Sequence, residues 1–260
     1  MSNSRSFDRA ANYYDQTRLL LEPIERHGIP AILDLIGPQA RLLEVGCGTG
    51  RISIPLLERG VNLVGCDLSS PMLKRFQEKI PSAPITQVDA TMLPFATASF
   101  DAALTVHVLH LIPTWRDVLR ELRRVLAPGA VYLNVRTWDS TGTSIGQQIR
   151  TFWRGWLSAN GVDAGPVGVR NHEEFLQEIH AAGATVTEVE AVRFSKSFHL
   201  GEELERFGSR VYSETWDIPD AIFDASMKEL RAWVMHEYGS LDREISDEVR
   251  FVIHAVRFAA

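Results

Sequence analysis

Three glycines at alternate positions are the clearest chemical signal in this chain. They occur in the run Gly46-Cys47-Gly48-Thr49-Gly50, directly after the apolar run Leu42-Leu43-Glu44-Val45. A helical pattern follows over residues 51–59 and stops at Gly60. A glycine-rich turn between a strand and a helix lets a ligand approach the backbone, because no Cβ blocks it and the N–H groups of the helix point outward. These residues predict a nucleotide-type pocket.

Two acidic residues stand close to this turn. Glu44 precedes the first glycine by two residues, where a carboxylate can accept hydrogen bonds from the turn amides or from a cationic ligand group. The alternative is a structural, salt-bridged acid. Asp67 ends a second predicted strand about 20 residues beyond the turn, a position suited to binding both hydroxyls of a ribose. The alternative makes Asp67 an N-terminal acid of the helix that Ser69-Ser70-Pro71 opens.

The glycine spacing argues against a dinucleotide site. The dinucleotide fingerprint is G-x-G-x-x-G, and its last glycine lets the helix pack closely on the strand. Here the third glycine comes one residue early, and Arg51 takes the place of the last glycine of the fingerprint. A nicotinamide-dependent oxidoreductase is therefore disfavoured.

Further motifs follow in a fixed order. The run Leu93-Pro94-Phe95 leads through Ser99-Phe100-Asp101 into an apolar strand, and the run ELRRVLAPGA occupies residues 121–130. With the pattern E-x-G-x-G-x-G, these motifs resemble the class I S-adenosylmethionine-dependent methyltransferases over residues 41–138. The leader over residues 7–18 and the middle motifs are most similar to the small-molecule, quinone-biosynthesis-like branch of that family.

The resemblance implies roles for residues beyond the glycine turn. It implies that Asp89 binds the adenine amino group and that the N–H of Ala90 meets a ring nitrogen. Met72 then flanks the base, unless it is ordinary core. Tyr14 and Arg18 in the leader reach the amino-acid end of the cofactor, unless they belong to an amphipathic helix packed beside the sheet. Together, the residues assigned to the cofactor are Tyr14, Arg18, Glu44, Gly46, Cys47, Gly48, Gly50, Asp67, Leu68, Met72, Asp89, Ala90 and His107.

Two histidines are the candidate catalytic residues. The run His107-Val108-Leu109-His110 lies where the family closes over the methionine end of the cofactor and opens to the acceptor. An imidazole titrates near working pH, so His107 or His110 could serve as a base if the acceptor carries a proton of high pKa. The alternative is structural, with the main-chain carbonyl of His107 more important than its ring. No Cys/His spacing suggests a metal site.

The alternation of strands and helices predicts an α/β fold. We expect a doubly wound, seven-stranded, mostly parallel sheet of the Rossmann-like methyltransferase type, with an antiparallel final strand and helical lid insertions. One domain is expected over residues 1–260. Its parts are a helical lid (1–39), a cofactor-binding core (40–139), further sheet and helices (140–200), a helical insertion (201–240) and a closing strand (249–258). Aromatic residues in the later segments, Trp153, Trp156, Phe198, Tyr212 and Trp216, could line an apolar acceptor site, but helix-packing core fits most of them better.

Composition restricts the partners. The chain has 260 residues and a formal net charge of −6, so nucleic acid is not expected as a partner. No apolar run approaches the roughly 20 residues that cross a membrane, and no signal-peptide core stands at the start. The two cysteines, Cys47 and Cys66, are expected to be buried and reduced in a cytoplasmic protein. We expect a monomer or a homodimer.

The predicted function is methyl transfer to a small-molecule acceptor. S-adenosylmethionine would supply the methyl group, S-adenosylhomocysteine would be the product, and the acceptor would attack in line at an oxygen, nitrogen or carbon atom. Positioning and exclusion of water would supply most of the catalysis. The alternative is a protein that keeps the S-adenosylmethionine fold but binds the cofactor without methyl transfer or uses it differently.

Overall fold

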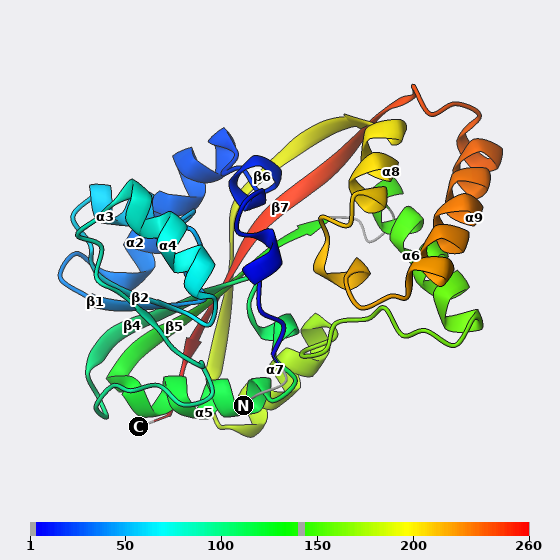
Figure 1. Cartoon of the computed structure of the whole chain (residues 1–260). Helices are drawn as coiled ribbons and strands as arrows, with labels where there is room; N and C mark the ends of the chain where they lie inside the picture. Colours follow the sequence, from blue (N-terminus) through cyan, green and yellow to red (C-terminus); the bar gives the residue numbers. More distant parts are fainter. Residues whose placement is uncertain (1–3, 140–143, 260) are drawn as a thin grey trace. The chain divides into compact units, whose positions relative to one another are not determined.

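The structure, a computed structural model, describes residues 4–139 and 144–259. It contains a seven-stranded sheet with the strand order β3-β2-β1-β4-β5-β7-β6 (Figure 1). The strands are β1 (Arg41–Val45), β2 (Asn62–Asp67), β3 (Ile85–Gln87), β4 (Phe100–Val106), β5 (Leu126–Asp139), β6 (Thr185–His199) and β7 (Glu244–Arg257).

Helices alternate with these strands along the chain. The α-helices are α1 (Tyr14–Thr17), α2 (Ile29–Ile36), α3 (Ser53–Glu58), α4 (Ser70–Lys79), α5 (Trp115–Val125), α6 (Ile145–Ala159), α7 (His172–Ala181), α8 (Leu200–Gly208) and α9 (Asp220–Tyr238). Short helical turns are η1 (Asp8–Ala10), η2 (Ile24–Gly28), η3 (Leu109–Leu111) and η4 (Ser213–Thr215). None of the described helices combines the length and the apolarity needed to cross a membrane.

The sheet is parallel over its first five strands. β1 pairs in parallel with β2 and β4, β2 with β3, and β4 with β5. β1 is buried on both faces from its second residue onward, as a central parallel strand must be. In Figure 1 the arrow of β7 points opposite to those of β5 and β6. The predicted seven-stranded, mostly parallel sheet with a reversed final strand is confirmed.

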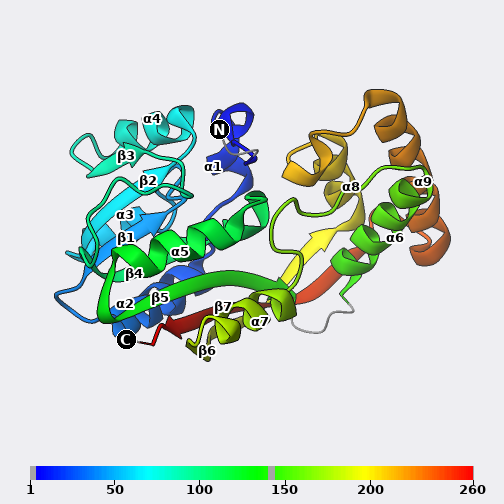
Figure 2. The same ribbon diagram turned by 90° about the horizontal axis from the view of Figure 1, so that it is seen from below.

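Helices cover both faces of the sheet. On one face, Leu122 of α5 and Phe175 of α7 share a hydrophobic core with Leu43 of β1 and Tyr132 of β5. Figure 2 shows α5 and α7 on this same side. On the other face, α2 and α3 pack against each other and α3 contacts β2. Because the strands are parallel, their carboxyl ends meet at one edge, where ligands bind in folds of this type.

The strand bounds add detail that the sequence analysis did not give. β5 begins at Leu126, and its pairing with β4 shifts from Phe100↔Leu126 to Ala102↔Val131. The Ala127-Pro128-Gly129 run therefore forms a bulge inside the strand, with Gly129 at φ +81°, instead of a connecting loop. β7 begins at Glu244, earlier than the predicted 249. β3 is short and ends at Gln87, so Asp89 lies in the turn beyond it.

The chain divides into two compact units. The first comprises Met1–Thr137, Val167–Val192 and Phe251–Ala260, and the second comprises Trp138–Pro166 and Arg193–Arg250. The predicted insertion over 201–240 lies inside the second unit, which also contains α6. The single-domain organisation and the lid role of residues 1–39 and 201–240 stay predictions.

The second unit has its own hydrophobic core between α6, α8 and α9. Trp153 is fully buried there and donates its Nε1–H to Ser226 Oγ at 2.9 Å. Trp156, Phe198 and Tyr212 are partly buried against the same core. Trp216 is also buried, and its Nε1–H donates to the carbonyl of Arg210. These contacts match the core interpretation of the late aromatic residues.

Candidate functional site

A cleft opens in the first unit at the carboxyl edge of β1, β2 and β4. Its empty space amounts to about 730 Å³ when the open solvent at its mouth is included. Its lining is formed by the leader, the glycine turn, the segment after β4 and two acidic turns. The acidic turns are the one with Asp67 after β2 and the one with Asp89 after β3. The lining residues are Ser4, Arg5, Ser6, Phe7, Tyr14, Val45, Gly46, Gly48, Cys66, Asp67, Leu68, Met72, Val88, Asp89, Ala90, Val106, His107, Val108, Leu111 and Ile112.

The glycine turn adopts a backbone that only glycine tolerates well. Gly46, Gly48 and Gly50 all have positive φ values, of +78°, +56° and +88°. A Cβ on Gly46 would overlap Val108, and one on Gly50 would lie 2.8 Å from the ring of Phe76. The turn therefore requires glycine for both conformation and space, and it exposes the Gly46 and Gly48 backbone to the cleft.

Asp67 connects the turn to β2. Its Oδ2 accepts a hydrogen bond from the Gly48 N–H at 2.9 Å, and its Oδ1 accepts one from the Ser69 N–H at 2.8 Å. Ser69 is the N-cap of α4 and accepts from the Met72 N–H, so the helix cap is Ser69. Burial raises the pKa of Asp67, and the backbone donors counteract that effect. A carboxylate has about four lone-pair positions, so acceptor capacity remains for a ligand in the cleft.

Glu44 lies beneath the turn and is not part of the cleft lining. It is 2% exposed, and its Oε2 accepts a very short hydrogen bond from Ser53 Oγ in α3. Burial raises the pKa of Glu44 to about 8, while the Ser53 hydrogen bond and the charge of Arg51 work in the opposite direction. The partner is a hydroxyl of the following helix and not the turn amides that the sequence suggested. Direct cofactor contact by Glu44 stays a prediction.

Asp89 and Ala90 both reach the cleft from the turn after β3. Asp89 Oδ1 accepts hydrogen bonds from the backbone N–H and the hydroxyl of Thr91, at 3.0 and 2.8 Å. These bonds fix the carboxylate beside the opening. Leu68 and Met72 line the same region, and Met72 is 2% exposed, so it belongs both to the core and to the cleft wall.

His107 lies where β4 leaves the sheet. Its φ is +56°, an uncommon value for a residue other than glycine but one that histidine tolerates better than most. Its N–H donates to the carbonyl of Val135 in β5 at 3.2 Å. Burial lowers the pKa of its imidazole well below the usual value, and the charges of Arg51, His110, Arg136 and Arg18 lower it further. The ring is therefore held neutral in a strongly cationic neighbourhood.

The leader is tied down over the cleft by contacts at three places. The Arg5 N–H donates to the carbonyl of Leu111 at 2.9 Å. Asp15 accepts from Thr49 Oγ1 at 2.6 Å and pairs with Lys79 Nζ at 2.7 Å. The Arg75 guanidinium donates to Asn12 Oδ1 at 2.7 Å. The leader, the glycine turn and α4 are thus linked on one side of the opening.

The cleft brings together most of the predicted cofactor residues. Tyr14, Gly46, Gly48, Asp67, Leu68, Met72, Asp89, Ala90 and His107 all line it. Predicted residues outside the lining are Arg18, Glu44, Cys47, Gly50 and His110. Arg18 is the C-cap of the four-residue α1, and its N–H donates to the carbonyl of Tyr14 at 2.9 Å. The roles of these residues in binding the cofactor stay predictions.

Sequence reasoning missed the first residues of the leader and the apolar wall. Ser4, Arg5, Ser6 and Phe7 line the cleft, and Phe7 packs edge-on against Tyr14 with ring centroids 5.9 Å apart. Arg5 donates its N–H to the carbonyl of Leu111, a contact between distant segments that no local sequence pattern signals. Val108, Leu111 and Ile112 are apolar residues after β4, where the sequence drew attention to the two histidines.

Comparison with known proteins agrees with this geometry. Residues 43–133 match the family model described as a methyltransferase domain. The chain is 36% identical over 126 residues to a demethylmenaquinone methyltransferase of Beutenbergia cavernae, covering 47% of this chain and 52% of that protein. It is 35% identical over 128 residues to a malonyl-[acyl-carrier protein] O-methyltransferase of Salmonella typhimurium, covering 48% and 49%. The chain thus spans about half the length of these curated relatives.

Solved structures share the fold over most of this chain. A Bacillus halodurans protein with a provisional methyltransferase name superimposes with a TM-score of 0.61 at 17% identity, covering 90% of this chain and 98% of its own. The [4+2]-cyclase SpnF superimposes with a TM-score of 0.50 at 18% identity, covering 97% and 82%.

The matched segment begins in β1 and ends in β5, so it contains the glycine turn, both acidic turns and the wall after β4. The presence of a demethylmenaquinone methyltransferase among the similar proteins agrees with the resemblance to the quinone-biosynthesis-like branch. Residues 43–133 of this chain are therefore similar in sequence to methyltransferase domains, and the chain shares its fold with a solved structure that is described as a methyltransferase.

Proposed function

We propose that this protein transfers a methyl group from S-adenosylmethionine to a small-molecule acceptor by in-line displacement. The observation that carries the proposal is the convergence of Gly46, Gly48, Asp67, Asp89 and Ala90 in one cleft. These residues come from the ends of three adjacent strands, and the family motif assigns each of them to the cofactor. Sequence similarity supports the same activity for the domain over residues 43–133.

The polar groups that line the cleft fit an adenosyl group. The Gly48 backbone lines the cleft, and a ligand can approach it closely because glycine has no Cβ. Asp67 presents a carboxylate whose two backbone bonds leave lone pairs for a vicinal diol. These features support an adenosine ligand.

Each part of the cofactor would be held by a different wall. Asp67 would accept hydrogen bonds from the ribose hydroxyls. Asp89 and Ala90 would read the adenine edge, with Leu68 and Met72 against its faces. Tyr14 would contact the amino-acid end, with Arg18 near its carboxylate. The remaining assigned residues, Glu44, Cys47 and Gly50, would shape the turn from behind.

Catalysis would come mainly from positioning and exclusion of water. S-adenosylmethionine, when bound, supplies a methyl group made electrophilic by a positively charged sulfur. The leader, fixed to Leu111 by Arg5 and to Thr49 by Asp15, would cover the reacting end and exclude solvent. Holding two reactants in line is worth roughly 7–11 kcal/mol in favourable systems, so no further catalytic group is required for a good nucleophile.

The histidines contribute differently in this proposal. The low pKa of His107 makes its imidazole a weak proton acceptor, since a catalytic base works best with a pKa near the operating pH. We therefore assign His107 to shaping the cleft through its left-handed backbone. His110 stays the candidate base for an acceptor with a high pKa, although its ring lies outside the lining in this structure.

The competing function is cofactor binding without methyl transfer. The same fold occurs in a [4+2]-cyclase, so the fold by itself does not select methyl transfer over other chemistry. The two possibilities share the adenosine pocket and differ only in the fate of the methyl group. An experiment must therefore measure binding and transfer separately.

Calorimetric titration of the full chain with S-adenosylmethionine and S-adenosylhomocysteine tests the binding step. NAD(H) and NADP(H) serve as controls. We expect micromolar binding of the first two alone, with Asp67→Ala weakened and the distant Asp101→Asn unchanged. Binding of a nicotinamide nucleotide instead would overturn the assignment of the cleft.

Radiolabelled methyl uptake tests the transfer step. Two acceptors follow from the relatives, demethylmenaquinone and malonyl-acyl carrier protein, because these names indicate a quinone ring and a carboxylate as acceptors. Uptake by either defines the methylated atom. Tight cofactor binding, combined with no uptake by a broad acceptor panel, would favour the non-transferring alternative.

We also propose a cytoplasmic protein that works as a monomer or homodimer without nucleic acid. Cys47 and Cys66 are buried free thiols, and burial raises the pKa of both, which makes them unreactive. The net charge of −6 disfavours binding to phosphate backbones. Size-exclusion chromatography with light scattering measures the oligomeric state.

A further inference from the structure

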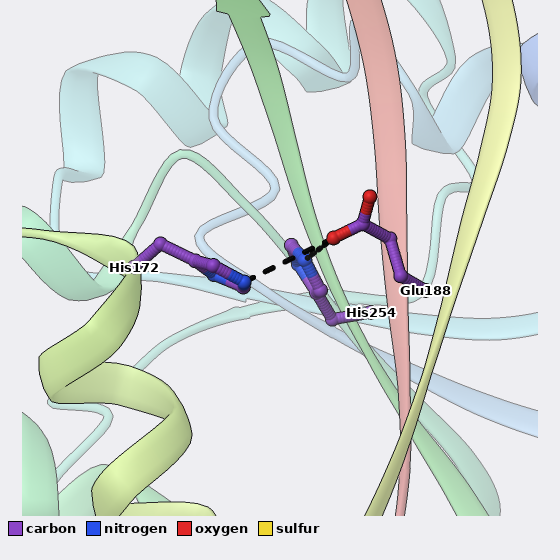
Figure 3. Close-up of side chains that lie close together, drawn as sticks. All are labelled: His172, Glu188 and His254. Carbon is purple, nitrogen blue, oxygen red and sulfur yellow. Dashed lines mark hydrogen bonds and ion pairs between the residues drawn. The ribbon is translucent and has the colours of Figure 1, made fainter.

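A cluster of two histidines and one glutamate lies in the first unit, away from the residues assigned to the cofactor. His172 is the first residue of α7, Glu188 lies on β6 and His254 lies on β7. Figure 3 shows the three side chains pointing toward one another from these separate elements. One ligand atom from each residue lies within 4.8 Å of the other two. The proposed methyl transfer uses none of them.

We propose that His172, Glu188 and His254 form a binding site for one divalent cation of the zinc class. The chemistry of the donors supports this choice, because two imidazoles and one carboxylate are a recurrent three-ligand set for zinc, with a fourth position left for water. Harder cations such as Mg²⁺ and Ca²⁺ prefer oxygen ligands throughout. The inference does not depend on methyl transfer.

The distances are close to those that coordination requires. Bonds of about 2.1 Å in a tetrahedron place neighbouring ligand atoms roughly 3.4 Å apart. His254 Nε2 lies 3.2 Å from Glu188 Oε2, and His172 Nε2 lies 3.9 Å from the same oxygen. The two imidazole rings are 4.4 Å apart between centroids and tilted by 33°. Small rotations of side chains would bring all three atoms into one coordination sphere.

The backbone holds the three side chains in place. The N-terminus of α7 is capped by Asn171, whose side chain accepts a hydrogen bond from the Glu174 N–H at 2.8 Å. β6 and β7 are adjacent strands of the sheet, so Glu188 and His254 are presented by a rigid frame. Sites built on strands and helices hold their ligands more accurately than sites on loops.

The three side chains differ in how far solvent reaches them. His254 is 1% exposed, whereas Glu188 is exposed enough for an ion to enter.

One nearby charge acts against a bound cation. The charge of Arg136 lowers the pKa of His172, so this guanidinium lies within electrostatic range of the cluster. It would repel a metal ion, but the Glu188 carboxylate supplies a compensating negative charge in direct contact. The balance favours a cation that binds imidazole strongly over one held by charge alone.

The test is calorimetric titration of the tag-free, chelator-stripped full chain with zinc chloride. We expect about one equivalent to bind with a dissociation constant below about 100 μM. His172→Ala and Glu188→Gln should each weaken binding at least about tenfold, which corresponds to roughly 1.4 kcal/mol. Cobalt(II) should give a visible d–d absorption band that both variants lose.

His180→Ala is the matched control, because His180 is an exposed histidine in the last turn of the same helix. It should leave zinc affinity unchanged. His172 is only half-buried and Glu188 more exposed still, so both test variants can be examined as folded proteins, unlike a change at the buried His254. The proposal is overturned if the unaltered chain binds no zinc below about 100 μM. It is also overturned if the His172 and Glu188 variants bind as tightly as the His180 control.

Discussion

Gly48 donates its backbone N–H to Asp67 Oδ2 at 2.9 Å, which joins the glycine turn after β1 to the acidic end of β2. The same carboxylate accepts the Ser69 N–H at the start of α4. One side chain therefore fixes two backbone segments that border the cleft. It follows that changes at Asp67 act on the shape of the turn as well as on any ligand that the carboxylate binds.

Replacing Asp67 with alanine should weaken binding of S-adenosylhomocysteine at least tenfold. A hydrogen bond to a charged group is worth roughly 1.5–3 kcal/mol, and the loss of order at Gly48 adds to this effect. Isothermal titration calorimetry measures the change. Asp101→Asn is the control, because Asp101 pairs with Arg41 at the opposite end of its strand. A folded Asp67→Ala protein with unaltered affinity would show that the ribose site is elsewhere.

Gly46→Ala should remove cofactor binding and destabilise the fold more than Gly60→Ala does. Both glycines have positive φ values, of +78° and +81°, so both variants carry a conformational cost of about 1–2 kcal/mol. A Cβ at Gly46 also overlaps Val108, whereas nothing lies within 4 Å of one at Gly60. Urea unfolding of both variants separates the steric cost from the conformational cost.

The double variant Gly46→Ala/Val108→Ala provides the internal check. If the clash with Val108 causes the extra loss, shortening that side chain should restore part of the stability and give a non-additive cycle. Strictly additive effects of the two changes would show that Val108 is not the cause.

Asp15→Ala should raise the dissociation constant for S-adenosylhomocysteine by about 1.4- to 5-fold. Asp15 holds the leader to Thr49 and Lys79, and half-exposed ion pairs of this kind contribute roughly 0.2–1 kcal/mol. Stopped-flow measurement should place the effect in a faster dissociation rate. Glu22→Ala is the control, because it breaks an exposed ion pair with Arg26 that lies beyond the leader in the sequence. It should leave the dissociation constant unchanged. Equal effects of the two variants would argue against a closing role for the leader.

The sequence was sufficient for features that depend on neighbouring residues. The alternate glycines at 46, 48 and 50 and the strand-end Asp67 could be recognised because turn chemistry and strand patterning are local. Features built from distant segments were not accessible in the same way. The Ser53 partner of Glu44 and the Thr49 partner of Asp15 depend on how α3 and the leader pack, and no local pattern specifies that packing.

The histidine–glutamate cluster illustrates the same limit. Glu188 and His254 are 66 residues apart in sequence and meet only because β6 and β7 are adjacent in the sheet. No short-spaced Cys/His motif announces them. The extended β5 has a similar origin, since pairing with β4 overrides the turn tendency of Pro128 and Gly129 and converts the turn into a bulge.

Glu44→Gln should stabilise the protein at pH 8 and reduce the dependence of stability on pH. Burial raises the folded-state pKa of Glu44 to about 8 from an ordinary value of 4.5, so the folded chain binds a proton that the unfolded chain releases. The contribution of this bound proton to the free energy of unfolding is fully present below about pH 4.5 and is lost as pH rises toward 8. The loss amounts to a few kcal/mol in order of magnitude.

Urea unfolding of the unaltered chain and of Glu44→Gln between pH 5 and 9 measures this effect. The free energies of unfolding of the two proteins should diverge as pH rises, and the value for Glu44→Gln should be the higher one. Glu58→Gln, at the exposed end of α3, should follow the unaltered chain. Parallel curves for the unaltered chain and Glu44→Gln would mean that Glu44 is ionised in the folded protein and that Ser53 stabilises its charge.

The imidazole of His107 should stay neutral throughout the range in which free histidine titrates. Burial and the charges of Arg51, His110, Arg136 and Arg18 lower its folded-state pKa, so the unfolded chain takes up a proton that the folded chain does not. Stability is therefore lost as pH falls below about 6.5. NMR of histidine labelled with carbon-13, assigned through His107→Asn, should show no titration of this ring between about pH 5.5 and 8.5. An inflection near pH 7 would contradict the structural role and return His107 to the list of candidate bases.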